Sequence, residues 1–176
     1  AYPALAAARL SFEEIANPTH FDRDPALAWG FYGHRLALYR STLPHAGFAL
    51  LQGLAEPMEH GVFVFTSNVD GQFQKSGFPA DRVCEVHGSI HHLQCSAPCC
   101  AAIWRADDFL PEVDAAACRL RNEVPRCPSC GAVARPNILM FGDGAWLAER
   151  TAAQQRRLEA WRCKTERLLV IELGAG

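Results

Sequence analysis

The chain has 176 residues, with 17 Lys and Arg against 19 Asp and Glu, which gives a formal net charge of −2. This length fits one domain, or one domain with a small insertion. The hydrophobic fraction of 49% is enough for a core and excludes a disordered chain. The near-balanced charge argues against a general nucleic-acid or membrane-surface binder, whose footprint is basic. No apolar run approaches the roughly 20 residues of a membrane span, so we expect neither nucleic acid nor membrane as a partner.

The first 60 residues are predicted to be helical. Ser11, followed by Phe, Glu and Glu, looks like a helix start with acids in the first turn. Residues 17–24 read as a loop, and Pro25 suits the first turn of a longer helix. Pro44 is expected to open another helix. Apolar stripes of this kind generally indicate helices that bury their own face, and a wall for a substrate or cofactor is the alternative.

Two short apolar runs follow the helices, and each ends in polar residues. Residues 62–65 are β-branched and aromatic, as expected of a strand covered on both faces. Directly after them come Thr66, Ser67, Asn68 and Asp70. Residues 82–86 form the second run, which ends in His87 and Gly88, and residues 71–81 read as a loop or short helix between the strands. Because open α/β sheets build their sites at the carboxyl ends of strands, one sheet edge is predicted to present an Asn, an Asp and a His.

Four of the eight cysteines fall in two tight pairs. These are Cys95, Cys99, Cys127 and Cys130. Four thiolates form a typical closed structural zinc site, and an ion that binds with on the order of 10 kcal/mol can offset closure of the loop between the pairs. Scattered buried thiols or a redox pair are the alternative, which two such pairs disfavour. Cys100 is a second candidate ligand beside Cys99, and the Ser-Ala-Pro turn favours Cys99.

After the cysteine pairs, the sequence pattern predicts that the chain returns to the main α/β sheet. Residues 137–141 are expected to rejoin it, residues 145–163 to form a polar amphipathic helix, and residues 168–173 to form a further buried strand. The predicted organisation is a helical module at 1–60, an α/β domain at 61–91 and 137–176, and a zinc-binding module at 92–136. No export signal is visible, so a reducing cytoplasm is the expected location.

The segment Thr66-Ser67-Asn68-Val69-Asp70 and the pair His87-Gly88 resemble, in this order, the signatures of the sirtuins. The sirtuins are the silent-information-regulator family of NAD-dependent protein deacylases. The two cysteine pairs and residues 138–143, which resemble the family's Phe-Gly-acid motif, make the match specific over most of the chain. The resemblance implies an α/β fold with a Rossmann-like parallel sheet, an inserted zinc-ribbon module and a helical module.

The resemblance also implies roles for residues. His87 would be the general base that acts on a ribose hydroxyl of NAD, Asn68 would position the ribose and a water, and Asp70 would accept a hydrogen bond from the nicotinamide carboxamide. The further expected NAD contacts are Thr66, Ser67, Gly174, Ala175 and Gly176. The expected peptide-binding residues are Met140, Phe141, Gly142 and Asp143, whose backbone would pair with the substrate as an added strand. The zinc would be structural.

The implied activity is removal of an acyl group from a protein lysine, with transfer to ADP-ribose and release of nicotinamide. Two alternatives remain: NAD cleavage or ADP-ribosyl transfer at the same site, and a non-catalytic zinc-ribbon module that binds protein. The sequence departs from the family because Ser67 replaces a Gln, Asp143 replaces a Glu, and the opening Gly-Ala-Gly loop is not found. We therefore expect an incomplete copy of a larger enzyme, which on its own binds NAD poorly and turns over little.

Overall fold

The helices of the first third of the chain begin where the sequence supplies caps. The computed structural model describes residues 10–174, and its helices there are α2 (Phe12–Ile15), α3 (Thr19–Arg23), α4 (Pro25–Ser41) and α5 (Ala46–Ala55). Ser11 and Glu14 form a reciprocal capping box on α2. The Asp24 carboxylate accepts the backbone N–H of Leu27, and Pro25 occupies the first turn of α4. The helical prediction is confirmed for the described residues, except that residues 17–24 contain α3 and are not only loop.

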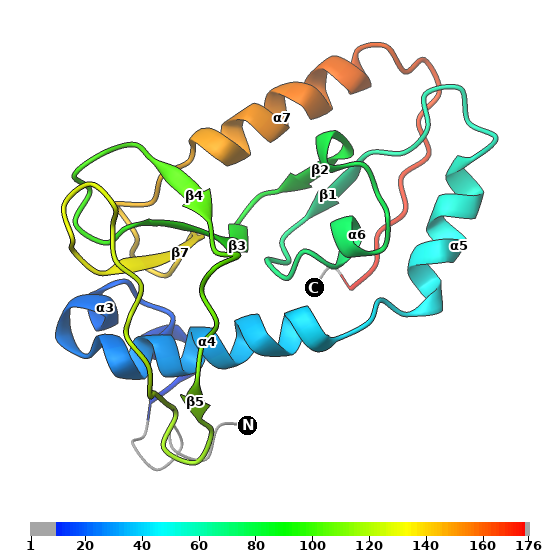
Figure 1. The fold of residues 1–176 in the computed structure, drawn as a ribbon. Coiled ribbons are helices and arrows are strands. Elements are labelled where there is room, and N and C mark those ends of the chain that lie inside the picture. Colours follow the sequence, from blue (N-terminus) through cyan, green and yellow to red (C-terminus); the bar gives the residue numbers. More distant parts are fainter. Residues whose placement is uncertain (1–9, 175–176) are drawn as a thin grey trace.

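Two separate sheets lie between these helices and the last one (Figure 1). The strands of the first are β1 (Val64–Thr66) and β2 (Val83–Glu85), which pair in parallel and are connected through α6 (Gln72–Lys75) and a short 3-10 turn (Ala80–Arg82). The second sheet has the order β4 (Ile103–Arg105), β3 (Gly88–Cys95), β7 (Ala134–Ile138), and all its pairs are antiparallel. A small ribbon of β5 (Val113–Asp114) and β6 (Arg119–Leu120) packs on α4. The mixed α/β architecture with a parallel pair agrees with the sequence prediction.

Three expectations about the strands were wrong. Residues 137–141 do not rejoin the parallel sheet, because Asn137 and Ile138 belong to β7 and pair antiparallel with β3. The strand at 62–65 is not covered on both faces, since β1 begins at Val64 and the Phe65 side chain is 65% exposed. Residues 168–173 are an exposed, irregular segment and not a buried strand. No described strand pairs with this segment, and a strand without a partner leaves its backbone groups unpaired.

The main core lies between α4 and the antiparallel sheet. Trp29 is fully buried there, and its Nε1–H donates to the Ala134 carbonyl at 2.9 Å. Its ring meets Phe21 and Phe109 edge-to-face, an arrangement that adds to the gain from burial. A second, smaller cluster consists of Val64, Phe78 and Val83 and supports the parallel pair.

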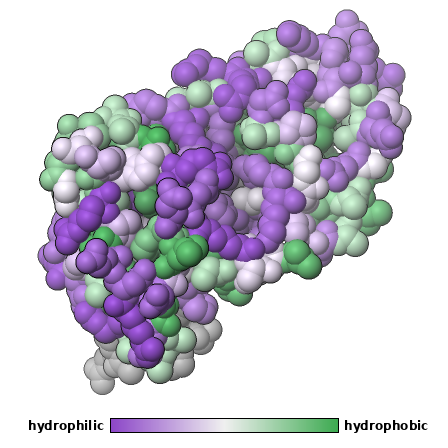
Figure 2. Space-filling model, in the orientation of Figure 1, coloured by the Kyte–Doolittle hydropathy of each residue, from purple (hydrophilic) through white to green (hydrophobic). Residues whose placement is uncertain are grey.

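The last helix, α7 (Glu149–Arg162), covers the edge of β2 with polar side chains. Gln154 accepts the backbone N–H of Glu85 at 3.1 Å, and the Thr151 hydroxyl donates to the Glu85 carbonyl at 3.1 Å. Arg150 forms an ion pair with the buried Glu85 carboxylate. Figure 2 shows polar side chains over α7 and apolar ones along the edge over α5, where Leu50 and Leu54 are exposed. No helix among the described residues is both long and apolar enough to cross a membrane.

Candidate functional site

The parallel register brings the two predicted strand ends to one edge of the sheet. Thr66 is paired with Glu85, so the segments that follow them leave the sheet side by side. Two hydrogen bonds hold these segments together: Val86 N–H donates to the Thr66 carbonyl, and Ile90 N–H donates to the Val69 carbonyl, both at 2.9 Å. Sites of open α/β sheets form at such an edge, which agrees with the location expected from the sequence.

His87 lies exposed at this edge, and the residue after it must be glycine. The His87 carbonyl accepts the Leu139 N–H at 2.9 Å, which fixes its backbone against the end of β7. Gly88 has a φ of +82°, and a Cβ there would lie 2.0 Å from the Asn137 carbonyl oxygen. Any side chain at Gly88 would therefore force the strands apart. The glycine is thus a structural requirement of the place where the chain enters the antiparallel sheet, whereas the His87 side chain is left in solvent.

The polar residues after β1 form a short turn. Thr66 Oγ1 accepts the Asn68 N–H at 3.1 Å, while the side chains of Ser67 and Asn68 are exposed. Asp70 Oδ1 accepts the Gln72 N–H at 3.0 Å and thereby begins α6. The structure therefore presents Ser67 and Asn68 to solvent at the same edge as His87, with Asp70 partly buried behind them.

His91 contacts this turn, although no feature of the sequence predicted such a contact. Its Nε2 lies 2.9 Å from the Asp70 carbonyl oxygen. Burial lowers the pKa of His91, an effect that the Asp70 carbonyl partly opposes. From the sequence, the adjacent pair His91-His92 is a further candidate for metal ligation, although such a pair near a strand end is more typical of surface residues or of residues that support the ligands. Alternation along β3 separates them, with His92 opposite Arg105 of β4.

The expected peptide-binding segment is more enclosed than the sequence suggests. Asp143 forms a two-pronged ion pair with Arg135 at 2.8 Å in both bonds, and the two side chains are 0% and 1% exposed. The N–H groups of Leu139 and Phe141 donate to the carbonyls of His87 and Ala16. These two amides are therefore not available for backbone pairing with a peptide.

Side chains of the same segment point in different directions. Met140 is buried, while Gly142 and the Phe141 ring are exposed. The ring of Phe141 meets Phe12 edge-to-face at 6.1 Å. The exposed Phe141 and Gly142 are therefore the part of the segment that an external chain can reach.

Of the C-terminal candidates, the structure describes only Gly174. Gly174 follows the exposed segment 168–173, has a φ of +65°, and makes no hydrogen bond to residues 66–70 within the described part of the chain. Ala175 and Gly176 lie outside the described residues. The suggested loop contact between these three residues and NAD stays a prediction.

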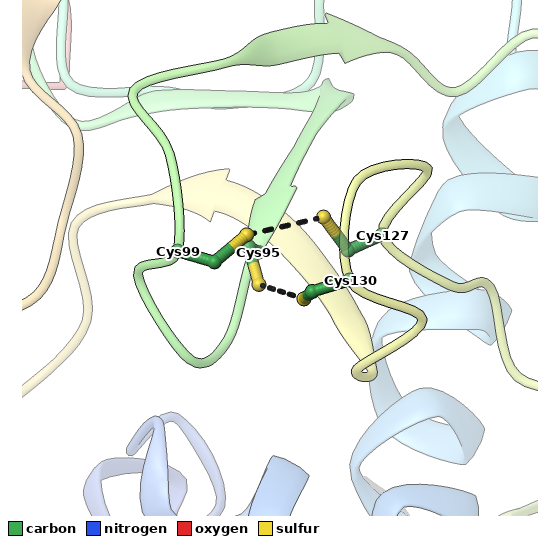
Figure 3. A group of neighbouring side chains, drawn as sticks. All are labelled: Cys95, Cys99, Cys127 and Cys130. Carbon is green, nitrogen blue, oxygen red and sulfur yellow. Dashed lines mark hydrogen bonds between the residues drawn. The ribbon is translucent and has the colours of Figure 1, made fainter.

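The four predicted thiols come together at one end of the antiparallel sheet (Figure 3). Cys95 ends β3, Cys99 lies in the loop after it, and Cys127 and Cys130 flank a turn before β7. All four sulfurs lie within 4.8 Å of one another. The pairs Cys95–Cys130 and Cys99–Cys127 are each 3.6 Å apart. Four thiolates at about 2.3 Å from a tetrahedral zinc would be about 3.8 Å apart, so this cluster is compatible with a zinc module.

Within the cluster, Cys127 should lose its proton more readily than Cys99. Burial raises the pKa of Cys127, but the backbone N–H groups of Ser129 and Cys130, together with the thiols of Cys99 and Cys130, lower it to about 6 overall. The neighbouring thiols, above all that of Cys130, hold the pKa of Cys99 well above its usual range. Metal ligation requires all four thiolates, so a divalent cation would displace the remaining protons. Cys100 lies 3.6 Å from Cys99 and 3.8 Å from the Ser129 hydroxyl, outside the four-sulfur cluster.

Known sequences match most of this chain. The profile of the Sir2 family matches residues 7–169. An NAD-dependent protein deacylase of Pyrococcus furiosus is 35% identical over 143 residues, which cover 80% of this chain and 53% of that protein. NAD-dependent protein deacylase 1 of Pseudomonas aeruginosa is 34% identical over 136 residues, which cover 77% and 52%. The chain therefore spans about half the length of the relatives that it matches.

Solved structures give the same assignment. The crystal structure of a Sir2 homologue in complex with NAD has a TM-score of 0.64 and 25% identity, and the match covers 86% of this chain and 54% of that one. A structure described as the structural basis for the mechanism and regulation of Sir2 enzymes has a TM-score of 0.56 and 28% identity, covering 84% and 53%. These neighbours confirm the fold class predicted from the sequence. Family profile, sequence identity and fold thus lead to one conclusion: the chain belongs to the Sir2 family.

Proposed function

We propose that this chain forms the nicotinamide-ribose and acyl-lysine side of an NAD-dependent protein deacylase. The observation that carries the proposal is the parallel pairing of Thr66 with Glu85, which leaves His87 and Asn68 exposed at one sheet edge. The deacylase relatives, at 34–35% identity, and the Sir2 homologue bound to NAD support it. The products would be the free lysine, nicotinamide and an O-acyl-ADP-ribose.

Three side chains carry the proposed chemistry. His87 is exposed, so its imidazole can take a proton from a ribose hydroxyl that enters from solvent. Asn68 offers an amide to a ribose oxygen and a water, and Asp70 offers a carboxylate oxygen to the carboxamide of nicotinamide. Thr66 and Ser67 complete the proposed contacts on this side. NAD supplies the electrophilic ribose carbon that makes the acyl group transferable.

The described residues account for only part of an NAD-binding site. The described residues provide polar groups for its nicotinamide ribose, but among residues 10–174 no strand leads through a Gly-rich turn into a long helix. β1 is followed by a single glycine, Gly71, which begins only the four-residue α6. A phosphate cradle of the usual kind requires free amides at a helix N-terminus. We therefore expect tight NAD binding only in a natural protein that adds such a cradle to this chain.

The four-cysteine cluster is proposed to hold one structural zinc. A closed shell of four thiolates leaves no position for water, so the ion would stabilise the fold and take no part in the reaction. A reducing compartment such as the cytoplasm would keep these thiols available. The proposed partner is an acylated lysine in an extended protein segment, placed against Phe141 and Gly142, with Met140 and Asp143 supporting the turn from inside.

Nicotinamide release tests the proposal. The natural protein that contains this chain is incubated with NAD, with and without an acetylated lysine peptide. Release that depends on the peptide, with one deacetylated peptide formed per nicotinamide, is the expected result, and His87→Ala should abolish it. Release without peptide would favour NAD cleavage or ADP-ribosyl transfer instead. No release under either condition would contradict an NAD-dependent activity.

A further inference from the structure

The turn that carries Asp70 is attached to β3 by two consecutive residues. The Ile90 N–H donates to the Val69 carbonyl at 2.9 Å. The His91 ring, on the next residue, places Nε2 2.9 Å from the Asp70 carbonyl. A carbonyl accepts hydrogen bonds and does not donate them, so Nε2 must carry the proton. This contact places a proton on Nε2, and burial of the ring, which lowers the pKa of His91, favours the neutral imidazole in which Nδ1 is unprotonated.

These two bonds fix the backbone on both sides of Asp70. The Val69 carbonyl belongs to the peptide plane before Asp70, and the Asp70 carbonyl belongs to the plane after it. Because peptide units are planar, holding both planes sets the two soft backbone dihedrals of the residue between them. The first bond uses a backbone amide that most residues would provide. The second requires a side chain of suitable length with a donor at its end, and His91 supplies it.

Gly71 shows how closely the ring fits. A Cβ at this position would lie 2.8 Å from Cδ2 and 3.0 Å from Nε2 of His91, and the backbone has a φ of +71°. The imidazole thus occupies the space beside the turn that a larger residue at position 71 would need. The ring is therefore enclosed against the turn and is not a mobile surface side chain.

We propose that His91 is a positioning residue for the reaction, which acts through the Asp70 carbonyl to orient the Asp70 carboxylate. This inference rests on the proposed function, which assigns that carboxylate to the nicotinamide carboxamide. Oδ1 of Asp70 already accepts the Gln72 N–H at 3.0 Å. Among the described residues no donor bonds Oδ2, so the direction of that oxygen depends on the bond of Oδ1 to Gln72 and on the backbone that His91 holds. His91 itself touches no reacting atom.

The direct test uses the chain itself and needs no NAD. Long-range proton–nitrogen NMR spectra identify the tautomer of each histidine, and the expected signature of His91 is protonated Nε2. His91→Phe keeps a ring but removes the donor, so exchange of the Gln72 amide with solvent should become about 5–10-fold faster, as loss of one typical hydrogen bond implies. His91→Gln can still donate to the Asp70 carbonyl and should restore slow exchange.

The neighbouring residue provides the matched control. His92 lies on the same strand, is also partly buried, and bonds no atom of residues 66–72. His92→Ala should leave exchange of the Gln72 amide unchanged. A protonated Nδ1 at His91, or Gln72 exchange that is equal in the chain and in both His91→Phe and His91→Ala, would overturn the positioning role. The second variant guards against a phenylalanine that finds a new packing.

Steady-state kinetics of the natural protein distinguish this inference from the proposed function. In the natural protein, His91→Phe should lower kcat/KM for NAD about tenfold, and His91→Gln should recover most of it. Full activity of His91→Phe would refute the positioning role while leaving the proposed function intact. A natural protein that shows no NAD-dependent activity would refute the proposed function and, with it, the catalytic part of the inference. The NMR result would then decide only whether His91 holds the turn.

Discussion

Two regions of the molecule are held together in different ways. The antiparallel region comprises β4, β3, β7, α3 and α4 with the four cysteines, and the parallel region comprises β1, β2, α5, α6 and α7. The antiparallel region contains the large apolar core around Trp29. In the parallel region the buried apolar cluster found among the described residues consists of Val64, Phe78 and Val83, and polar side chains of α7 bond the edge of β2. The proposed catalytic edge thus lies where a well-packed half meets a half that depends on a few hydrogen bonds.

The largest effect expected is loss of the metal from the antiparallel region. Cys127→Ser should abolish stoichiometric zinc and destabilise the cysteine module, because structural zinc contributes on the order of 10 kcal/mol to such sites. Metal analysis of the gently purified chain measures this, and one zinc per chain is the expected value for the unaltered sequence. A stoichiometry near zero in that sequence would contradict the site.

Cys100→Ser is the control for ligand identity. Its sulfur lies beside Cys99 but outside the four-sulfur cluster, so zinc content and melting temperature should stay the same. If Cys100→Ser loses zinc and Cys99→Ser keeps it, the assignment of Cys99 as the ligand is wrong.

The next effect concerns the buried ion pair of the antiparallel region. Asp143→Ala leaves the Arg135 guanidinium buried without its partner carboxylate. Removing one member of a buried pair typically costs about 3–5 kcal/mol of unfolding free energy. Urea denaturation of the zinc-loaded chain measures the loss. A change below about 1 kcal/mol would show that Arg135 finds solvent or another acceptor.

A smaller loss is expected where α7 bonds the parallel region. Gln154→Ala removes the acceptor of the Glu85 N–H and leaves a buried donor without its partner, which costs about 1–3 kcal/mol. Gln155→Ala is the matched control on the same helix, because that side chain is exposed and should change stability by no more than about 0.5 kcal/mol. Equal effects of the two substitutions would show that α7 holds β2 by other means.

The free energy of unfolding should change gradually with pH because of His92, which lies on β3 and is close to Arg150 of α7. Burial, followed by the charges of Arg150 and Arg105, lowers the pKa of His92 to about 3, against an ordinary value of 6.5. Between these values the unfolded chain binds a proton that the folded chain does not, so stability is lost as pH falls from about 6.5 towards 3. Because one proton is involved, the slope cannot exceed about 1.4 kcal/mol per pH unit, and solvent screening of a partly exposed ring lowers it further.

His92→Gln should flatten this part of the profile. Chemical denaturation at several pH values between 4 and 7 compares the variant with the unaltered chain, and the other titrating groups contribute equally to both. Identical slopes would show that His92 charges as readily in the folded chain as in the unfolded one.

The smallest effect on stability is expected at His87, where the effect on activity should be largest. The side chain is exposed, so His87→Ala should leave the melting temperature and the zinc content unchanged. In the natural protein the same change should lower deacylation by about 10²–10⁴-fold, the usual contribution of a general base. An unaltered turnover would remove His87 from the mechanism.

Local signals in the sequence predicted local structure well. Ser11 and Pro25 marked helix starts that the structure confirms, and the spacing of the cysteine pairs predicted a cluster of four. The polar residues after two apolar runs indicated one sheet edge, because parallel strands must end on the same side. Each of these signals depends on a few neighbouring residues or on the chemistry of one residue type.

Features that depend on contacts between distant segments of the chain could not be predicted from the sequence. The sequence predicts an amphipathic helix at 145–163, yet the residues that α7 buries are the polar Thr151 and Gln154, which provide hydrogen-bond partners for the edge of β2. Asp143 resembles a surface residue after a glycine turn, and only the fold brings it to Arg135. The apolar run at 168–173 looks like a buried strand, but burial also requires a neighbouring strand, which a single segment cannot specify.

Because α7 covers the edge of β2, it also limits how copies of this chain can associate through their sheets. An exposed strand edge is a template for the addition of another strand, and proteins guard against this by covering the edge. Gln154 and Thr151 occupy the N–H and carbonyl of Glu85 on the outer side of β2, so that side is closed to self-association. β1 has no described strand on its other side, and Phe65 is exposed on it. At high concentration, aggregation of this chain should therefore begin at β1, and a charged residue in place of Phe65 should suppress it.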